Sequence, residues 1–96
     1  MPAYVIYEAQ VLDPEAYEAY KTSAAASVAA AGGRYIVRGG PVEVLEGDPP
    51  QGRTVVVEFP TMEAALAWYH SAAYTDARRL RERAARARMY LIDGVT

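Results

Sequence analysis

Four charged residues within expected strands offer the clearest basis for chemistry in this sequence. Arg34, Arg38, Glu43 and Glu58 each lie in a run of β-branched or aromatic residues. Because side chains alternate along a strand, Arg34 and Arg38 are expected to share a face with Ile36. We favour ion pairs between strands or between subunits, since buried charges are normally paired. The alternative is a small cleft in which an arginine binds an anionic group and Glu58 moves a proton.

Three tyrosines are expected to line such a cleft. The chain has eight tyrosines and one phenylalanine, and a phenol combines apolar area with a hydroxyl group that forms hydrogen bonds. Core packing accounts for most of these tyrosines. The expected ligand is a small organic molecule, anionic or aromatic, and the expected ligand-binding residues are Arg34, Arg38, Tyr7, Tyr69 and Tyr74.

His70 is the single histidine of the chain. On a helix expected to begin at Thr61 it lies near Glu63 and away from the apolar positions, which indicates a partly exposed side chain. An exposed histidine is most often a surface residue, and the alternative roles are catalytic base and haem ligand. Glu58 and His70 are therefore the two candidate catalytic residues.

The composition excludes several classes of site. The chain has no cysteine, which excludes disulfides, thiolate nucleophiles and cysteine-ligated metals. One histidine cannot form a two-histidine zinc site, and Gly32-Gly33 follows an expected helix instead of opening one, unlike a phosphate-binding loop. Ser23, Ser27 and Ser71 lack the surroundings of a nucleophile elbow. We therefore expect no metal and no cofactor.

The N-terminal third predicts a strand followed by a helix. Residues 3–11 are rich in β-branched and aromatic residues. Asp13-Pro14-Glu15 combines a capping carboxylate, a proline suited to the first helical position and an acid at the positive end of the helix dipole. Gly32-Gly33 permits a left-handed C-cap. The apolar positions recur at helical spacing: Tyr17, Tyr20, Ala24, Val28 and Ala31.

The middle of the chain predicts three extended runs, residues 34–38, 42–46 and 53–59. Gly39-Gly40 between the first two indicates either a tight hairpin turn or a bulge that bends one long edge strand, and we favour the bulge. Residues 47–52 are dense in turn formers. Residues 42–46 are therefore expected to pair antiparallel with residues 53–59.

The C-terminal third predicts two helices and a strand. Thr61 caps the first helix, and Ser71 caps the second. A final strand covers residues 89–92. The first helix has Met62, Ala65, Leu66 and Tyr69 on one face, and the second has an apolar stripe of Ala73, Ala77, Leu80, Ala84 and Ala87 opposite Arg78, Arg79, Arg83 and Arg86.

The resulting order, βαββαβ, predicts one α+β domain over residues 1–96, with an antiparallel sheet and helices on one face. Residues 53–59 carry apolar side chains on both faces of their strand. The face without helices would expose a large apolar patch, and a symmetric dimer formed sheet to sheet would cover it. The chain's expected partner is therefore a second copy of itself.

Several segments are distinctive in combination: Asp13-Pro14-Glu15 with Tyr17 and Tyr20, the run from Gly32 to Gly40, Glu43 to Gly47, Glu58-Phe59-Pro60, and Ala64-Ala65 through Trp68-Tyr69, Ser71 and Tyr74. With them, nearly the full length resembles the family known as domain of unknown function 1330, within the dimeric α+β barrel superfamily. The resemblance implies a ferredoxin-like subunit and a homodimer whose sheets face each other. It supplies no reaction, because the superfamily includes antibiotic-type monooxygenases, muconolactone isomerases, haem-dependent chlorite dismutases and ligand-sensing regulators.

Charge and hydropathy indicate neither nucleic acid nor membrane as a partner. Six of the ten basic residues lie between Arg78 and Arg88, but the net charge is −2 and no nucleic-acid-binding motif is present. No stretch has the apolar length of a membrane span, and the N-terminus lacks the pattern of a signal peptide, so we expect a cytoplasmic protein. The arginine and alanine bias and the absence of asparagine hint at a thermophilic bacterium.

Three functions are compatible with these residues. We favour a homodimer that binds a small organic ligand between sheet and helices. The second is a cofactor-independent monooxygenase or isomerase in which Glu58 or His70 is the base and Arg38 orients the substrate. The third is an interaction module without catalysis. A pocket of about 300 Å³ or more within reach of Glu58 and Arg38 would favour the first two.

Overall fold

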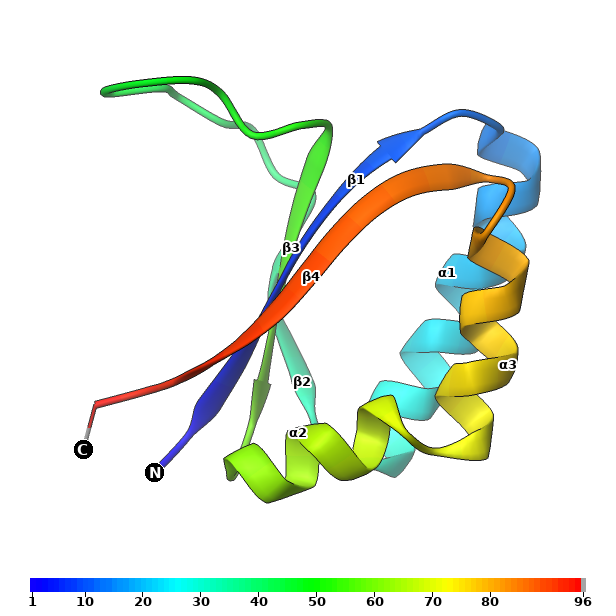
Figure 1. The fold of residues 1–96 in the computed structure, drawn as a ribbon, viewed down its shortest axis with the longest axis vertical. Helices are drawn as coiled ribbons and strands as arrows, with labels where there is room; N and C mark the ends of the chain where they lie inside the picture. Colours follow the sequence, from blue (N-terminus) through cyan, green and yellow to red (C-terminus); the bar gives the residue numbers. More distant parts are fainter. Residues whose placement is uncertain (96) are drawn as a thin grey trace.

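The computed structural model, which describes residues 1–95, has the βαββαβ order predicted from the sequence, with two consecutive helices before the last strand (Figure 1). The elements are β1 (Ala3–Val11), α1 (Pro14–Ala30), β2 (Arg34–Arg38), β3 (Arg53–Phe59), α2 (Met62–Tyr69), α3 (Ala72–Arg81) and β4 (Ala85–Asp93). The four strands form one sheet in the order β2-β3-β1-β4, and every neighbouring pair is antiparallel. This is the predicted ferredoxin-like α+β arrangement.

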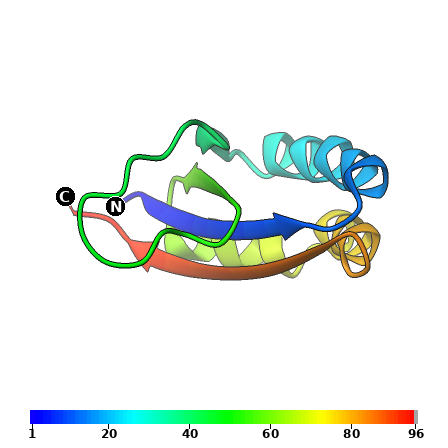
Figure 2. The same ribbon diagram turned by 90° about the horizontal axis from the view of Figure 1, so that it is seen from above.

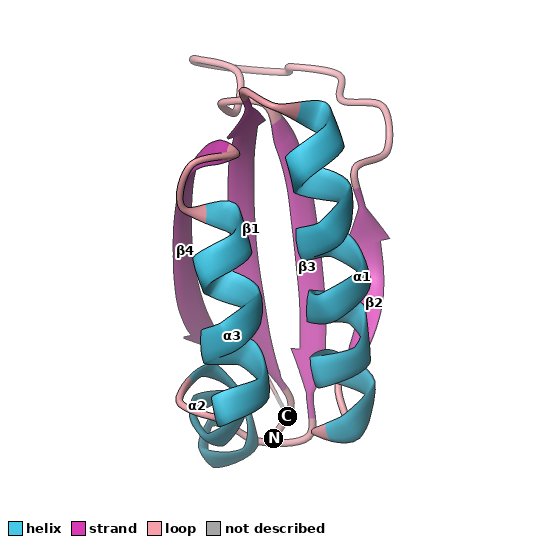
Figure 3. Cartoon of the chain, turned by 90° about the vertical axis from the view of Figure 1, so that its right-hand side faces the viewer, coloured by secondary structure: helices cyan, strands magenta, loops and turns pink. Residues whose placement is uncertain are grey.

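The helices cover one face of the sheet. Figure 3 shows α1 and α3 side by side in front of the strands, with α2 across one end. The opposite face, called the open face below, carries no helix among residues 1–95. A cleft between sheet and helices is therefore bounded by α1 or α2 on one side and by the central strands on the other.

The predicted helix starts are confirmed by their capping hydrogen bonds. The carboxylate of Asp13 accepts a hydrogen bond from the Ala16 amide at 3.2 Å. The hydroxyls of Thr61 and Ser71 accept in the same way from the amides three residues further on, at 3.0 and 3.2 Å. These contacts involve only residues close in sequence, so the amino-acid types were sufficient to predict them.

The core lies between the sheet and the helices. On α1 the predicted apolar positions from Tyr17 to Val28 are buried. Val55, Val57 and Phe59 are buried on the helical side of β3. On α2 the predicted face is partly wrong, because Ala65 and Trp68 are buried while Leu66 is exposed. Trp68 turns inward to pack against aromatic rings of β3 and α3, which rotates the buried face of this short helix.

Residues 42–46 do not form the predicted strand. β2 ends at Arg38, Gly39 has a positive φ of 72°, and residues 39–52 leave the sheet as a long loop, called the arm. β3 has two edges, and β1 and β2 occupy both of them. No edge of β3 is left for residues 42–46, so the pairing predicted between these residues and β3 is wrong.

A bulge is present, but it lies at Ile36 and not at the predicted Gly39-Gly40. Along β2, Tyr35 pairs with Val57 while Val37 pairs with Val56, so that Ile36 is the extra residue. A bulge adds one residue to one strand and reverses the alternation of side chains beyond it. Neither the tight hairpin turn nor the bulge expected at the two glycines is therefore found.

The bulge corrects the predicted orientation of the two arginines of β2. Arg34 pairs with Glu58, which lies on the open face. Arg38 pairs with Val55, whose side chain is buried on the helical face. The prediction that both arginines share a face with Ile36 is wrong, because the prediction assumed uninterrupted alternation.

The C-terminal strand is longer than predicted. α3 ends at Arg81, and β4 begins at Ala85 and pairs with β1 along its whole length. Ala84 lies in the turn between them, where its carbonyl accepts hydrogen bonds from the amides of Leu12 and Asp13. The predicted apolar stripe through Ala84 and Ala87 is therefore not one helical face, because pairing with β1 draws residues 85–88 into the sheet.

Candidate ligand-binding site

A cleft walled by tyrosines lies between the sheet and α1 and is called the tyrosine cleft. It encloses about 430 Å³, counting the part that opens to solvent, and its inner part of about 30 Å³ has room for very few water molecules. Its lining comes from all four strands of the sheet and from α1 and α2: Val5, Tyr7, Tyr17, Tyr20, Lys21, Ala24, Val28, Tyr35, Arg38, Arg53, Val55, Val57, Trp68 and Met89.

The hydroxyl groups behind this cleft form two buried pairs. The oxygens of Tyr7 and Tyr17 are 3.0 Å apart, and those of Tyr20 and Tyr74 are also 3.0 Å apart. Burial raises the pKa of Tyr17, Tyr20 and Tyr74 above the ordinary value of 10.0. These phenols are therefore neutral near pH 7, where they act as hydrogen-bonding groups and not as bases.

Three cationic side chains line the tyrosine cleft, and none of its lining residues is acidic. The guanidinium of Arg38 lies 4.3 Å from the centre of the Tyr35 ring, and that of Arg53 lies 5.9 Å from the Tyr17 ring. Lys21 is paired with a glutamate outside the lining at 3.0 Å. The cleft thus combines aromatic walls with an excess of positive charge.

Arg53 has an unused donor at this site. Its Nε atom is buried and has no hydrogen-bond partner within residues 1–95. A buried donor without a partner is costly, because the group has lost its water and gained nothing in exchange. An anionic group that reached this atom would supply the missing acceptor.

A second, more apolar cleft lies between α2 and the strands β1 and β4 and is called the apolar cleft. It encloses about 500 Å³, counting its open part, with inner room of about 190 Å³. Val5, Trp68 and Met89 line both clefts and form the wall between them. The remaining lining residues are Ala65, Leu66, Tyr69, Tyr90 and Leu91.

Trp68 is held at the junction of the two clefts. Its indole Nε1 donates to the Ser27 hydroxyl at 3.0 Å, and that hydroxyl donates to the carbonyl of Ala24 at 2.7 Å. Its ring centre lies 4.2 Å from that of Tyr74. The chain has one tryptophan, so any change at this junction is reported by a single fluorophore.

The structure separates the predicted ligand-binding residues. Arg38 and Tyr7 line the tyrosine cleft, and Tyr69 lines the apolar cleft. Tyr74 is fully buried behind the first cleft, with its hydroxyl on that of Tyr20. Arg34 lines neither cleft, because its side chain belongs to the open face.

Glu58 also lies on the open face, across the sheet from the tyrosine cleft. Its Oε1 accepts a hydrogen bond from Nε of Arg34 at 2.8 Å, as expected from the favoured interpretation of an ion pair between strands. This hydrogen bond holds the pKa of Glu58 below its ordinary value. Glu58 is therefore a weakened base that cannot reach a ligand bound beside Arg38, and the predicted joint cleft is not formed. Glu43 lies in the exposed arm.

His70 is exposed, as predicted, and its backbone amide donates a hydrogen bond to the Leu66 carbonyl at the end of α2. Its ring stands perpendicular to that of Tyr69, with 5.3 Å between the ring centres. It lines neither cleft. Neither predicted catalytic residue therefore touches the site that the geometry assembles.

Sequence reasoning did not identify Arg53, Lys21 and the tyrosines of α1 as parts of this site. The sequence does contain spacings that point to these residues. Tyr17, Tyr20 and Lys21 lie within about one helical turn, and Arg53 has the same strand parity as the buried Val55. What the sequence does not show is that these two elements meet across the sheet.

The arginines between Arg78 and Arg88 are divided between α3, a turn and β4, and several have partners within the chain. Arg78 donates to the Tyr69 hydroxyl at 2.7 Å, and Arg79 is 3.8 Å from an Asp76 oxygen. The guanidinium of Arg81 lies over the rings of Tyr7 and Tyr20. These intramolecular contacts account for much of the basic run.

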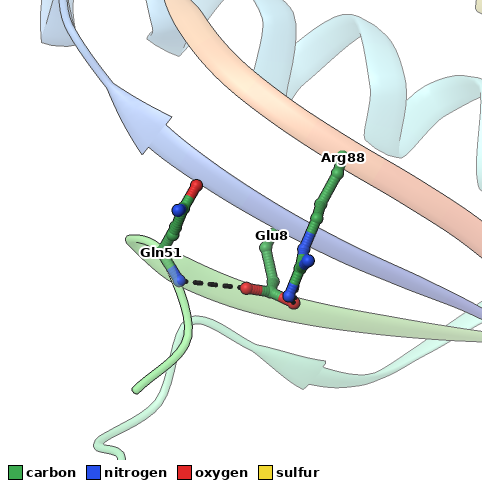
Figure 4. A network of polar contacts seen from close by, with 3 residues as sticks. All are labelled: Glu8, Gln51 and Arg88. Atoms are coloured by element: carbon green, nitrogen blue, oxygen red, sulfur yellow. Dashed lines mark hydrogen bonds and ion pairs between the residues drawn. The ribbon is translucent and has the colours of Figure 1, made fainter. Parts of the chain in front are cut away.

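Glu8 and Arg88 form an ion pair on the open face (Figure 4). One carboxylate oxygen of Glu8 accepts from Nη2 of Arg88 at 2.8 Å, and the other accepts from the backbone amide of Gln51 at 2.9 Å. These hydrogen bonds, first that of Gln51 and then that of Arg88, lower the pKa of Glu8. The pair therefore attaches the C-terminal end of the arm to β1 and β4.

The open face has an apolar centre between two charged borders. The registers place Val37, Val56, Ile6 and Tyr90 in one row across all four strands. The row on one side contains the Arg34–Glu58 pair, and the row on the other contains Glu8 and Arg88. Tyr90 is 52% exposed and Ile92, in the adjoining row, is 51% exposed. The open face therefore exposes a row of apolar side chains that no element covers within residues 1–95.

Within residues 1–95, no group of three or more histidine, aspartate or glutamate side chains could hold a metal ion. None of the helices there combines the length and apolar character of a membrane span.

A family model for domain of unknown function DUF1330 matches residues 2–95. The chain belongs to this family. This DUF1330 protein has no match among curated proteins. Its fold is similar to that of RPA0582, a protein of unknown function from Rhodopseudomonas palustris, with 18% identity and a TM-score of 0.76 over 99% of this chain and 83% of that one.

Two other structures share the fold of this DUF1330 protein. SnoaB, a cofactor-independent oxygenase from Streptomyces nogalater, has 13% identity and a TM-score of 0.70 over 99% of this chain and 94% of that one. Rv0793 from Mycobacterium tuberculosis has 15% identity and a TM-score of 0.63 over 100% of this chain and 97% of that one. These similarities show that the chain has the ferredoxin-like α+β fold that the sequence resemblance implied.

Proposed function

We propose that this protein binds a small aromatic carboxylate in the tyrosine cleft. The observation that carries the proposal is the buried Nε of Arg53, a donor without a partner, in a cleft lined by two arginines, a lysine and no acidic residue. A carboxylate accepts from an arginine in a charge-assisted hydrogen bond. The aromatic walls favour a ring beside that carboxylate.

The ligand requires more room than the tyrosine cleft offers without side-chain movement. The inner part of this cleft is small, whereas the apolar cleft behind Trp68 and Met89 is larger. Methionine has a flexible side chain that adapts readily to a ligand. In the proposed complex the carboxylate lies between Arg38 and Arg53, and the ring displaces Met89 toward the apolar cleft.

Binding without turnover fits the chemistry of the cleft better than the oxygenase or isomerase alternative. SnoaB is a cofactor-independent oxygenase with the same fold, but fold similarity at this identity does not transfer an activity. The bases predicted for such chemistry, Glu58 and His70, lie outside the cleft. We place the binding activity in the cytoplasm, as the sequence leads us to expect.

The test is a titration with benzoate-type carboxylates, followed by Trp68 fluorescence and by melting temperature. A ligand that binds the native state raises the melting temperature. We expect R38A and R53A to lower the affinity at least about tenfold, because each removes a charge-assisted hydrogen bond. R34A is the matched control, since it removes an arginine of the same strand from the opposite face. Equal losses in R34A and R38A, or no binding by the wild type, would contradict the proposal.

The protein is further proposed to be a homodimer in which two open faces pack together. The support is the apolar row of Val37, Val56, Ile6 and Tyr90, which no element of the chain covers within residues 1–95. A two-fold axis through this row would place the same apolar surface on both sides. Sedimentation equilibrium tests it: we expect a dimer at micromolar concentration, and I6D and V56D should yield monomers. A monomeric wild type would refute the pairing.

A further inference from the structure

No residue of the arm lines the tyrosine cleft or the apolar cleft, so ligand binding does not account for the position of the arm. Residues 39–52 extend away from the helices, on the side of the open face, and Figures 1 and 2 agree on this placement. Its ends are fixed to the sheet. The Gly39 amide donates to the Thr54 carbonyl at 2.8 Å, and the Gln51 amide donates to Glu8 at 2.9 Å.

The arm exposes apolar side chains. Val42, Val44 and Leu45 are 54%, 47% and 87% exposed. A flexible loop that only connects two strands is usually polar, because exposed apolar area has no compensating contact. These side chains lie too far from the helices to join the core, and they are held on the side where a second molecule is expected.

The charge of the arm is opposite to that of one end of the open face. The arm contains Glu43, Glu46 and Asp48 and no basic residue. At one end of the open face β4 carries Arg86 and Arg88, and Arg86 has no ion pair within residues 1–95. Complementary charges of this kind orient two surfaces that meet.

We infer that the arm of each subunit packs against the open face of a second copy of this chain, with its apolar side chains toward the partner and its acidic residues near the partner's β4 arginines. Two-fold symmetry makes the contact reciprocal, since one surface carries both the arm and the region that receives it. The inference rests on the proposed homodimer and adds a separate contact to it.

The two glycines at the ends of the arm are required for the direction in which the arm leaves the sheet. Gly39 and Gly52 both have positive φ angles, of 72° and 79°. A Cβ atom on Gly52 would clash with the Ala9 carbonyl oxygen. The direction in which the arm leaves the sheet is therefore fixed by backbone geometry, before any partner binds.

The decisive experiment compares dimer dissociation constants of the wild type, L45D and L80D by sedimentation. Leu45 belongs to the arm, and Leu80 is a comparably apolar, exposed residue of α3 on the helical side. We expect L45D to weaken the dimer at least about tenfold and L80D to leave it unchanged. Unfolding midpoints measured at low concentration control for effects on the monomer.

A cross-linking experiment tests the contact without disturbing it. The chain has no cysteine, so a mixture of L45C and R86C with a short bis-maleimide reports proximity between copies. We expect a covalent heterodimer from this mixture and none from L80C with R86C. A dimer that L45D leaves intact and that gives no L45C to R86C product would overturn the arm contact while the sheet pairing stands. A monomeric wild type would instead remove the homodimer on which the inference rests.

Discussion

Arg34 and Arg38 lie on opposite faces of the sheet although they are four positions apart on one short strand. The extra residue Ile36 reverses the alternation between them. As a result Arg34 pairs with Glu58 on the open face, and Arg38 stacks on Tyr35 beside the tyrosine cleft. One bulge thus assigns two similar residues to two surfaces with different roles, and their variants can serve as controls for each other.

Because of the Arg34–Glu58 and Arg88–Glu8 pairs, we expect the stability of the fold to decrease in acid. The folded-state pKa of each glutamate lies below its ordinary value of 4.5. Their stabilisation is therefore present above pH 4.5 and is lost as the pH falls through the lowered folded-state values. The free energy of unfolding, measured with urea between pH 3 and 7, should decrease at the acid end of this range. E8Q and E58Q should each reduce this loss of stability in acid, whereas E82Q, at an exposed position without an ion pair within residues 1–95, should retain the wild-type profile. Three identical profiles would contradict this assignment.

The buried hydroxyl pair of Tyr20 and Tyr74 predicts strong coupling between these residues. Y20F leaves the Tyr74 hydroxyl buried without its partner, at a cost of about 1 to 3 kcal/mol. Y20F/Y74F removes both polar groups and should cost less than the sum of the single changes. Chemical denaturation of the four proteins in the cycle gives the coupling energy. Additive single effects would argue against the hydrogen bond.

The Ser27 hydroxyl predicts a larger effect than its size suggests. It accepts the indole hydrogen bond of Trp68 at 3.0 Å. S27A leaves this buried donor without an acceptor and should destabilise the protein by about 1 to 3 kcal/mol. S23A, one turn earlier on α1, has no such partner within residues 1–95 and should lie within about 0.5 kcal/mol of wild type. Trp68 fluorescence during urea unfolding measures the free energy of unfolding of both variants. Equal stabilities of S27A and S23A would show that water replaces the Ser27 hydroxyl.

The backbone conformation at Gly52, at the end of the arm, is expected to require glycine. G52A places a Cβ atom against the Ala9 carbonyl at a positive φ and should destabilise the fold by more than about 1 kcal/mol. G40A, where a Cβ atom meets nothing within 4 Å, should be neutral or slightly stabilising. Thermal unfolding at matched concentration distinguishes the two. A melting temperature for G52A equal to that of G40A would mean that the arm adjusts freely at this position.

Local patterns in the sequence were sufficient for the order of elements and for the helix starts. Asp13, Thr61 and Ser71 cap their helices through amides three residues away. The buried stripe of α1 follows directly from 3.6-residue periodicity. The favoured ion pair of Arg34 was also correct, since a charge in a strand of apolar residues needs an opposite charge nearby.

Contacts between residues distant in sequence decided the rest. The choice of β2 over residues 42–46 as the neighbour of β3 depends on competition for one strand edge, which no local pattern records. The same competition created the arm, and the bulge in β2 changed the face of Arg38. The cleft then required α1 to carry its tyrosines over the strand that begins at Arg53. Amino-acid types thus predicted most of the elements, because their causes are short-ranged, whereas strand pairing excluded residues 42–46 from the sheet and selected which side chains meet.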